Sequence, residues 1–357
     1  MLTAEQRKRH EELRLLKKRI RDQYLGRNGV IGMSVGFKSV GGTETDDLVI
    51  RFHVRRKAPV SKENAVPSEI EGVKTDVVET NICLHSSIDQ YPPADPIEAD
   101  YGPPERDLYS PLVGGISIGA GRKELGSIGG TLGLIVTDIA TGAPMILSNF
   151  HVLCGNDGKD AKGDKICQPA RADNRGLCSK CATLERWAAG SYLVDGVSYG
   201  MDAAVARIPK KLFGYVRKFS TRSVREVGEV TFTDTVTLEL KMEVKKCGRT
   251  TGLTSGKINT VSLDIDHDFG GVIGKQRLYD QIEVAPKIDA QTKQENPVFG
   301  ASGDSGAVIL VESQLGSEKL MEVVGLNWGG EVVGGQTTGF SYGSPIGPIL
   351  KQLAVRI

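Results

Sequence analysis

The sequence has no long apolar run and no excess of charge of either sign. No segment approaches the roughly 18 consecutive apolar residues of a membrane-spanning helix, so no such helix is expected. Residues 1–27 lack the apolar core of a secretory signal, which predicts a cytoplasmic protein. Lys and Arg total 45 against 44 for Asp and Glu, so neither nucleic acid nor a membrane is an expected partner.

Helix-like periodicity is scarce after the N-terminus, whereas glycine is abundant, at 44 of 357 residues. From Gly114 onward, short apolar segments such as GTLGLIVTD and PMILSNFHVL alternate with Gly-rich turns. This spacing predicts an all-β barrel or sandwich. The chain is longer than the roughly 200–250 residues of a single barrel domain, so two folded units are expected.

Residues 3–25 predict an amphipathic helix. Leu13, Leu16, Ile20 and Tyr24 fall on one stripe at spacings of three and four, and the remaining residues are mostly charged. Two interpretations stay open: a surface helix packed by this stripe, or a docking helix for a regulatory protein partner.

We expect five segments along the chain. Residues 1–28 form the charged helix, 29–85 a small α+β domain, and 86–111 a linker rich in Pro and Asp. Residues 112–225 and 226–357 form the two β-rich units, and the second ends in a helix over GPILKQLAVRI. Regulation is expected to act through the helix or the 29–82 region.

Three short sequences carry residues suited to nucleophilic catalysis. LSNFHV places His151 after an apolar strand, GMDAAVARI places Asp202 at the start of another, and GASGDSGAVIL places Ser305 in a Gly-rich loop. A serine hydroxyl needs a base to take its proton, an imidazole can take it, and a carboxylate fixes the imidazole tautomer. Gly303 permits the dihedrals that would turn the N–H groups of Gly303 and Ser305 into an oxyanion hole.

These segments resemble chymotrypsin-like serine proteases. GDSGA resembles their GDSGG nucleophile motif, SNFHV their histidine segment and MDAAVARI their aspartate segment, in the same order along the chain. The resemblance covers residues 114–357 and implies a double six-stranded β-barrel. It also implies a serine endopeptidase that cleaves proteins or peptides through an acyl-enzyme and needs no cofactor for catalysis. GVIGMSVGFKSVGG and RFHVRRKAP further resemble intracellular bacterial and plant trypsin-like proteases, including the narrow-leaf type.

The resemblance also implies substrate-binding residues. Phe299, six residues before the nucleophile, corresponds to the base of the P1 pocket, where trypsin-like enzymes carry an Asp. An aromatic there implies a small or apolar P1 residue instead of Arg or Lys. Asn327, Trp328 and Gly329 resemble the strand that pairs with the substrate backbone.

Asp304 corresponds to the residue that receives a new N-terminal amine when secreted relatives are activated by cleavage. VGGISIG at 113–119 faintly resembles such an N-terminus. We expect a structural role for Asp304 and no requirement for cleavage.

Four of the six cysteines lie within 28 residues: Cys154, Cys167, Cys178 and Cys181. Cys178 and Cys181 form a CxxC, which is a moderate zinc signal, but a second CxxC is missing. A structural zinc held by four thiolates, ordinary thiols and disulfides all stay open. In a cytoplasmic protein, thiols or metal ligands are expected in preference to disulfides.

Two other functions would use the same residues. A catalytically idle scaffold with a protease fold would bind peptides through residues 327–329 and partners through the N-terminal helix. An esterase is the second, although esterases favour GxSxG on α/β folds and residues 301–306 read ASGDSG.

Overall fold

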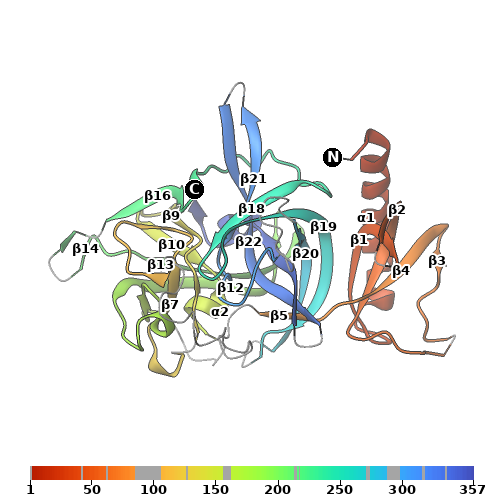
Figure 1. The fold of residues 1–357 in the computed structure, drawn as a ribbon, viewed down its shortest axis with the longest axis horizontal. Helices are drawn as coiled ribbons and strands as arrows, with labels where there is room; N and C mark the ends of the chain where they lie inside the picture. The colour runs from red at the N-terminus through yellow and green to blue at the C-terminus, as the bar shows by residue number, and fades with distance from the viewer. Residues whose placement is uncertain are drawn as a thin grey trace.

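The structure is a computed structural model of the chain. It describes residues 2–41, 43–61, 63–84, 106–125, 128–155, 162–212, 215–216, 218–270, 274–287, 298–315, 318–333 and 336–357. Most of the predicted linker, residues 86–105, lies outside the described residues. Three parts follow one another across the molecule in Figure 1: the first barrel, the second barrel, and α1 with its small sheet at the far end.

The N-terminal part begins with a capped helix. The Gln6 backbone N–H donates to Thr3 Oγ1 at 3.1 Å, and the Thr3 N–H donates to Gln6 Oε1 at 3.0 Å, a reciprocal arrangement that satisfies two N-terminal donors. The stripe of Leu13, Leu16 and Ile20 is buried, which confirms the packed surface helix. The elements are α1 (Ala4–Tyr24), β1 (Val30–Val40), β2 (Thr43–Val54), β3 (Glu69–Ile70), β4 (Val73–Glu79) and β5 (Ile82–Leu84).

The N-terminal sheet is continuous with the second barrel, whereas the sequence predicts a separate small domain. β1 pairs with β19, with Gly32 opposite Ile265 and Met33 opposite Asp264. The buried Lys17 of α1 reinforces this junction, because its Nζ lies 2.8 Å from Asp264 Oδ2. β5, which follows β4 along the chain, pairs with β22 of the second barrel (Figure 1).

The second barrel closes on itself within the described residues. Its strands follow one another by hydrogen bonding, and the pairing of the last with the first completes the circle. In this order they are β18 (Glu243–Gly248), β21 (Val308–Leu315), β22 (Glu318–Val333), β23 (Gln336–Pro345), β20 (Lys275–Pro286) and β19 (Gly252–Asp268).

The first barrel closes through a strand in two parts. β7 pairs with β8, and β8 continues through Leu132 and Gly133 into β9. The strands in spatial order are β8 (Gly130–Thr131) with β9 (Leu134–Asp138), β10 (Pro144–Ser148), β13 (Val197–Arg207), β12 (Lys180–Val194), β11 (Lys165–Cys167) and β7 (Ser117–Ala120). Together the two circles confirm the mostly β, double six-stranded barrel expected from the sequence.

Shorter elements complete the described part of the chain. They are β6 (Leu112–Gly114), η3 (Lys123–Leu125), α2 (Phe150–Leu153), η4 (Arg171–Asp173), β14 (Lys211–Leu212), β15 (Tyr215–Val216), β16 (Phe219–Val224), β17 (Gly228–Glu229), α3 (Ile346–Gln352) and β24 (Val355–Arg356).

Strands of the first barrel are buried on both faces. On β9, Ile135 packs inside the first barrel, while Leu134 and Val136 pack in a second cluster. That second cluster also contains Val308 and Leu326 of the second barrel, so it is the core between the barrels. The alternation follows from the two-residue period of a strand and holds the barrels against each other.

The predicted C-terminal helix is too long. α3 ends at Gln352, and β24 then pairs with β9, with Val355 opposite Asp138. Ala354 turns the chain between them with a φ of +47°. The partner strand lies more than 200 residues away in sequence, so the local pattern carried no sign of it.

Candidate active site

A histidine–aspartate pair is buried where β10 runs into α2. His151 is the second residue of α2, and its ring Nδ1 is hydrogen-bonded to Asp202 Oδ2 on β13. The His151 backbone N–H donates to the other oxygen, Oδ1, at 3.1 Å. Asn149 Nδ2 donates to the Asp202 carbonyl oxygen at 2.6 Å, which fixes the aspartate from the strand side.

This pairing defines the state of the far ring nitrogen. A neutral imidazole that donates from Nδ1 carries a lone pair on Nε2. Within the described residues, His151 Nε2 is buried and has no hydrogen-bond partner. In the tautomer that donates from Nδ1 to Asp202, His151 Nε2 is the nitrogen that could accept a proton.

Ser305 lies in a tightly held loop before β21. Gly303 has a φ of +96°, and a Cβ there would lie 2.4 Å from Thr250 Oγ1, so only glycine fits. Thr131 Oγ1 of the first barrel donates to the Gly303 carbonyl at 2.9 Å, and Thr250 Oγ1 of the second donates to the Ser302 carbonyl at 2.6 Å. Threonines from both barrels thus hold the backbone around the candidate nucleophile.

Two backbone donors of this loop are unused. Neither the Gly303 N–H nor the Ser305 N–H donates a hydrogen bond to any acceptor in the described parts of the chain. They are the two groups that the sequence predicts as an oxyanion hole. Unused donors beside a candidate nucleophile can stabilise negative charge on an oxygen bound there.

Asp304 points away from these donors into the protein. Its carboxylate accepts hydrogen bonds from the backbone N–H groups of Thr250 and Ala301, both at 2.9 Å, and lies 3.0 Å from Lys246 Nζ. Burial raises the pKa of Asp304, but the Lys246 ammonium and the hydrogen bonds from Thr251, Ala301 and Thr250 outweigh it, so the pKa lies below its usual range. Lys246 is the cation that neutralises Asp304, and the sequence analysis missed it.

The segments that carry the candidate triad approach each other at the junction of the barrels. A Cβ on Gly130 would lie 2.5 Å from Val152, next to His151, and 2.8 Å from the Ser305 carbonyl oxygen. The Ser305 hydroxyl donates to the Trp328 carbonyl at 3.0 Å, and His151 Nε2 is not its partner. The backbone of Ser305 thus lies near the short helix of His151, while the serine hydroxyl is hydrogen-bonded elsewhere.

The predicted substrate-binding residues divide into two groups. Asn327, Trp328 and Gly329 lie on β22, and Asn327 Nδ2 donates to the Asp304 carbonyl at 3.2 Å. Phe299, by contrast, is fully buried and packs in the core of the second barrel with Val284 and its neighbours. Its contact with a P1 side chain stays a prediction.

His267 is a buried residue outside the predicted site. It lies on β19, its ring centroid is 5.2 Å from that of Trp328, and its Nε2 has no partner within the described residues. Burial lowers the pKa of His267 to about 4, against an opposing contribution from the carboxylate of Asp202. A lone histidine in HDFGG carried no motif that could have revealed this position.

Two of the four clustered cysteines are joined to each other, which corresponds to the disulfide alternative for this pair. Cys167 and Cys178 form a disulfide, with their Cα atoms 5.1 Å apart, within the reach of this bond. Sulfurs joined to each other cannot act as thiolate ligands, so the set of Cys154, Cys167, Cys178 and Cys181 is not a four-thiolate site in this structure. The expectation that disulfides are absent is wrong for this pair.

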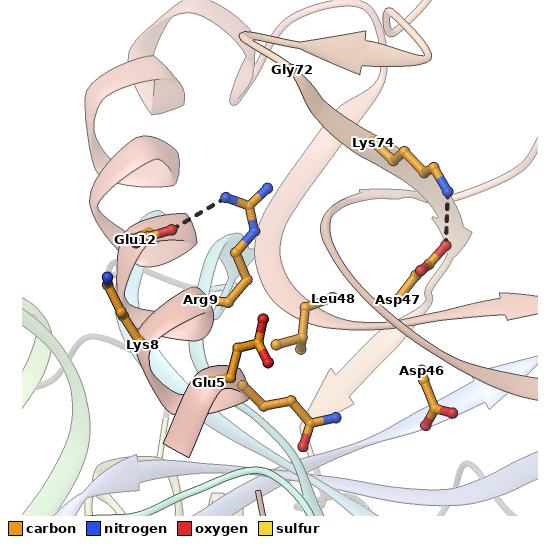
Figure 2. Close-up of a pocket in the computed structure, with 10 residues that line it drawn as sticks. Glu5, Lys8, Arg9, Glu12, Asp46, Asp47, Leu48, Gly72 and Lys74 are labelled. Carbon is orange, nitrogen blue, oxygen red and sulfur yellow. Dashed lines mark hydrogen bonds and ion pairs between the residues drawn. The ribbon is translucent and has the colours of Figure 1, made fainter. Parts of the chain in front are cut away.

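A charged cleft lies away from the candidate triad. It has a volume of about 530 Å³ and lies between α1 and the strands β2 and β4. Figure 2 shows Arg9 of α1 beside Glu12, and Lys74 of β4 bonded to Asp47 of β2, around the apolar Leu48. Because charges of both signs line the cleft, it favours no ligand of a single charge.

Across the described ranges, none of the helices combines the length and apolar character needed to cross a membrane.

Comparison with known proteins gives structural likenesses only. No family model and no curated protein matches the chain. Nocardiopsis protease is 16% identical with a TM-score of 0.41, and Thermobifida fusca protease A is 17% identical with a TM-score of 0.42; each match covers 69% of this chain and 97% of the other. A glutamic acid-specific serine protease matches at 18% identity and a TM-score of 0.41, over 69% of this chain and 100% of its own.

Proposed function

We propose that the chain is a serine endopeptidase that uses Ser305 as nucleophile, His151 as general base and acid, and Asp202 as the group that orients the histidine. The observation that carries this proposal is the buried His151–Asp202 pair, whose Nε2 has no hydrogen-bond partner within the described residues, together with a serine loop that has two N–H donors unused there.

The first step requires a rotation of the serine side chain. In the proposed step, the Ser305 hydroxyl leaves the Trp328 carbonyl and turns about its side-chain torsion to His151 Nε2. The oxygen then attacks the carbonyl carbon of the peptide while Nε2 takes its proton. Asp202 stays ionised and stabilises the imidazolium.

The next steps break the peptide bond. The oxygen of the tetrahedral intermediate accepts hydrogen bonds from the Gly303 and Ser305 N–H groups, and each such donor is worth about 3 kcal/mol in the barrier. The imidazolium returns its proton to the leaving amine, which gives an acyl-enzyme on Ser305. A water molecule, activated by the same histidine, hydrolyses the ester and restores the serine. This chemistry needs no metal or cofactor.

A fluorophosphonate probe tests the proposal directly. The unaltered chain should be labelled on Ser305, and Ser305→Ala should abolish labelling and peptide hydrolysis together. Asp202→Asn should lower kcat by about 10⁴-fold, because the histidine tautomer is no longer fixed. If the unaltered chain and Ser305→Ala behave alike, the endopeptidase proposal is wrong.

The same experiment separates the alternative functions. The position of the Ser305 hydroxyl on the Trp328 carbonyl favours an idle scaffold that binds peptides without cleaving them. Binding of a peptide without labelling would support that alternative. Turnover of ester substrates without cleavage of any member of a peptide library would support an esterase. Cleavage of the library would also define the P1 residue, for which we propose a small or apolar side chain.

Regulation and location are also proposals. The apolar stripe of α1 is used in internal packing, so a regulatory protein would have to bind the exposed charged face or the cleft of Figure 2. A cytoplasmic location stays a prediction, and the Cys167–Cys178 disulfide weighs against it because such bonds are rare in a reducing compartment.

A further inference from the structure

A strand of the N-terminal part lies on β22 beside the candidate nucleophile. β5 pairs with β22 in antiparallel orientation, with Leu84 opposite Gly329, Cys83 opposite Gly330 and Ile82 opposite Glu331. Gly329 directly follows Trp328, whose carbonyl accepts the Ser305 hydroxyl. The pairing therefore reaches Gly329, one of the three residues predicted to bind a substrate backbone, and ends beside the residue that accepts the serine hydroxyl.

The contact is specific in backbone and side chains. A Cβ on Gly329 would lie 2.8 Å from the Cys83 carbonyl oxygen, so glycine allows the two strands to approach closely. The side chains of Ile82 and Leu84, two residues apart on one face of the strand, both pack against the apolar cluster of Trp328 and its neighbours. The Val332 N–H donates to the Asn81 carbonyl at 2.9 Å and extends the pairing.

The edge of β22 that β5 occupies lies beside candidate catalytic residues that are buried. The side chains of His151, Asp202 and Ser305 are fully buried. A strand added to a sheet edge supplies backbone hydrogen bonds for affinity and side-chain contacts at alternate positions for specificity. β5 supplies both kinds of contact from within the chain.

We propose that β5 is an internal competitor that occupies the peptide-binding edge of β22, so that a peptide reaches Ser305 only when it displaces β5. The peptide class follows from the same contacts: an extended segment with aliphatic side chains two residues apart, as Ile82 and Leu84 are. The effect on cleavage rests on the proposed function, whereas the exchange of strands does not.

A binding experiment tests the exchange without catalysis. The probe is a fluorescein-labelled peptide VETNISL, which copies residues 78–84 with serine in place of Cys83, and the protein carries Ser305→Ala. Leu84→Glu puts a charge against the apolar cluster and should release β5. The matched control is Leu193→Glu, the same change at a leucine that is 71% exposed on β12.

The peptide should bind the Leu84→Glu protein at least about tenfold more tightly than the parent, because a site that is open less than about a tenth of the time weakens apparent affinity by that factor. The Leu193→Glu protein should bind like the parent. A peptide with aspartate in place of both aliphatic residues should not bind.

A second measurement keeps the β5 sequence unaltered. Cys83 is half-buried on β5, with its Sγ 3.6 Å from the Gly330 carbonyl, whereas Cys154, Cys181 and Cys247 are buried. Addition of the peptide VETNISL should raise the rate of Cys83 alkylation by iodoacetamide, measured by mass spectrometry. Equal peptide affinity for all three proteins, together with unchanged alkylation of Cys83, would overturn the inference.

Catalysis is the separate readout. In proteins that keep Ser305, Leu84→Glu should raise the rate of fluorophosphonate labelling at least about tenfold over the parent and the Leu193→Glu control. If no protein is labelled while the peptide still displaces β5, the proposed function fails and the strand exchange stands. If labelling is equally fast in all three proteins, β5 does not restrain the site.

Discussion

At the scale of single residues, the candidate site depends on a few buried polar contacts. His151 and Asp202 bond to each other, Asn149 holds the Asp202 carbonyl, and Lys246 neutralises Asp304. A buried polar group that loses its partner is costly, so these positions tolerate little change. Ser305 differs from them, because its hydroxyl is bonded to a backbone carbonyl, that of Trp328.

Lys246→Met tests the support of the serine loop. It leaves the Asp304 carboxylate buried without its cation, which should lower the free energy of unfolding by about 3–5 kcal/mol. The loop should also lose its geometry, so kcat should fall more than KM rises. Urea unfolding and peptide kinetics measure the two effects. Lys319→Met, at an exposed pair with Glu312, is the control and should change neither. Unchanged values for Lys246→Met would show that the pair does not hold the loop.

The cysteine cluster gives a second prediction at this scale. Purified chain should contain one disulfide, Cys167–Cys178, four thiols after denaturation, and no stoichiometric zinc. Mass spectrometry under non-reducing conditions, thiol titration and metal analysis measure these quantities. Cys178→Ser should lower the free energy of unfolding by about 2–3 kcal/mol, because a short loop is no longer closed in the unfolded chain. One zinc per chain, with six reactive thiols after denaturation, would favour the zinc alternative instead.

At the scale of elements, buried polar residues link the strands of the N-terminal sheet to the segment that precedes β5. His53 on β2 is hydrogen-bonded to Ser34 Oγ of β1 at 2.8 Å and to Thr80 Oγ1, just before β5, at 2.9 Å. Burial, with help from the charges of Arg51 and Lys17, lowers the pKa of His53 to about 3. His53 thus links the position of β5 to the folding of the small sheet.

This shift predicts a dependence of stability on pH. The unfolded chain gains a proton at His53 below about pH 6.5, whereas the folded chain gains it only near pH 3. The contribution of neutral His53 to the free energy of unfolding is therefore complete above about pH 6.5 and declines as the pH falls. One such group contributes a slope of about 1.4 kcal/mol per pH unit between those values. His53→Gln should remove about 1 kcal/mol per unit from the slope between pH 6 and pH 5 in urea unfolding. The same slope in both proteins would contradict the assignment.

At the scale of the whole molecule, three parts converge on one junction. The first barrel provides His151 and Asp202, the second provides Ser305, and the N-terminal part provides β5. The core between the barrels contains residues of both, so the candidate catalytic groups keep their relative positions only if the barrels stay packed.

The packing of Ile116 predicts that the chain needs no cleavage. Ile116 is fully buried in the core of the first barrel, and its carbonyl accepts the Leu132 N–H at 2.8 Å. Lys246 already provides Asp304 with a cation, so a new N-terminal amine is not required. The species labelled by a fluorophosphonate should therefore have the mass of the whole chain. A labelled species that begins near Gly115 or Ile116 would contradict this prediction.

The sequence by itself determined the fold class and the candidate residues. His151, Asp202 and Ser305 could be proposed because nucleophilic catalysis needs these residue types and the serine needs a Gly-rich turn. The helix over 3–25 and the strand pattern after Gly114 were also predictable, because burial on one face leaves a local period.

Only the tertiary structure decided which distant groups meet. Cys83 lies 247 residues from its contact at Gly330. Lys246 and Asp304 form an ion pair, but no local sequence pattern relates them. β5 has only three residues, too few to show a period, and its place is set by pairing with β22, a barrel strand much later in the chain. Long-range pairing of this kind depends on surfaces that exist only after the barrels have folded, which is why the state of the site could not be read from its motifs.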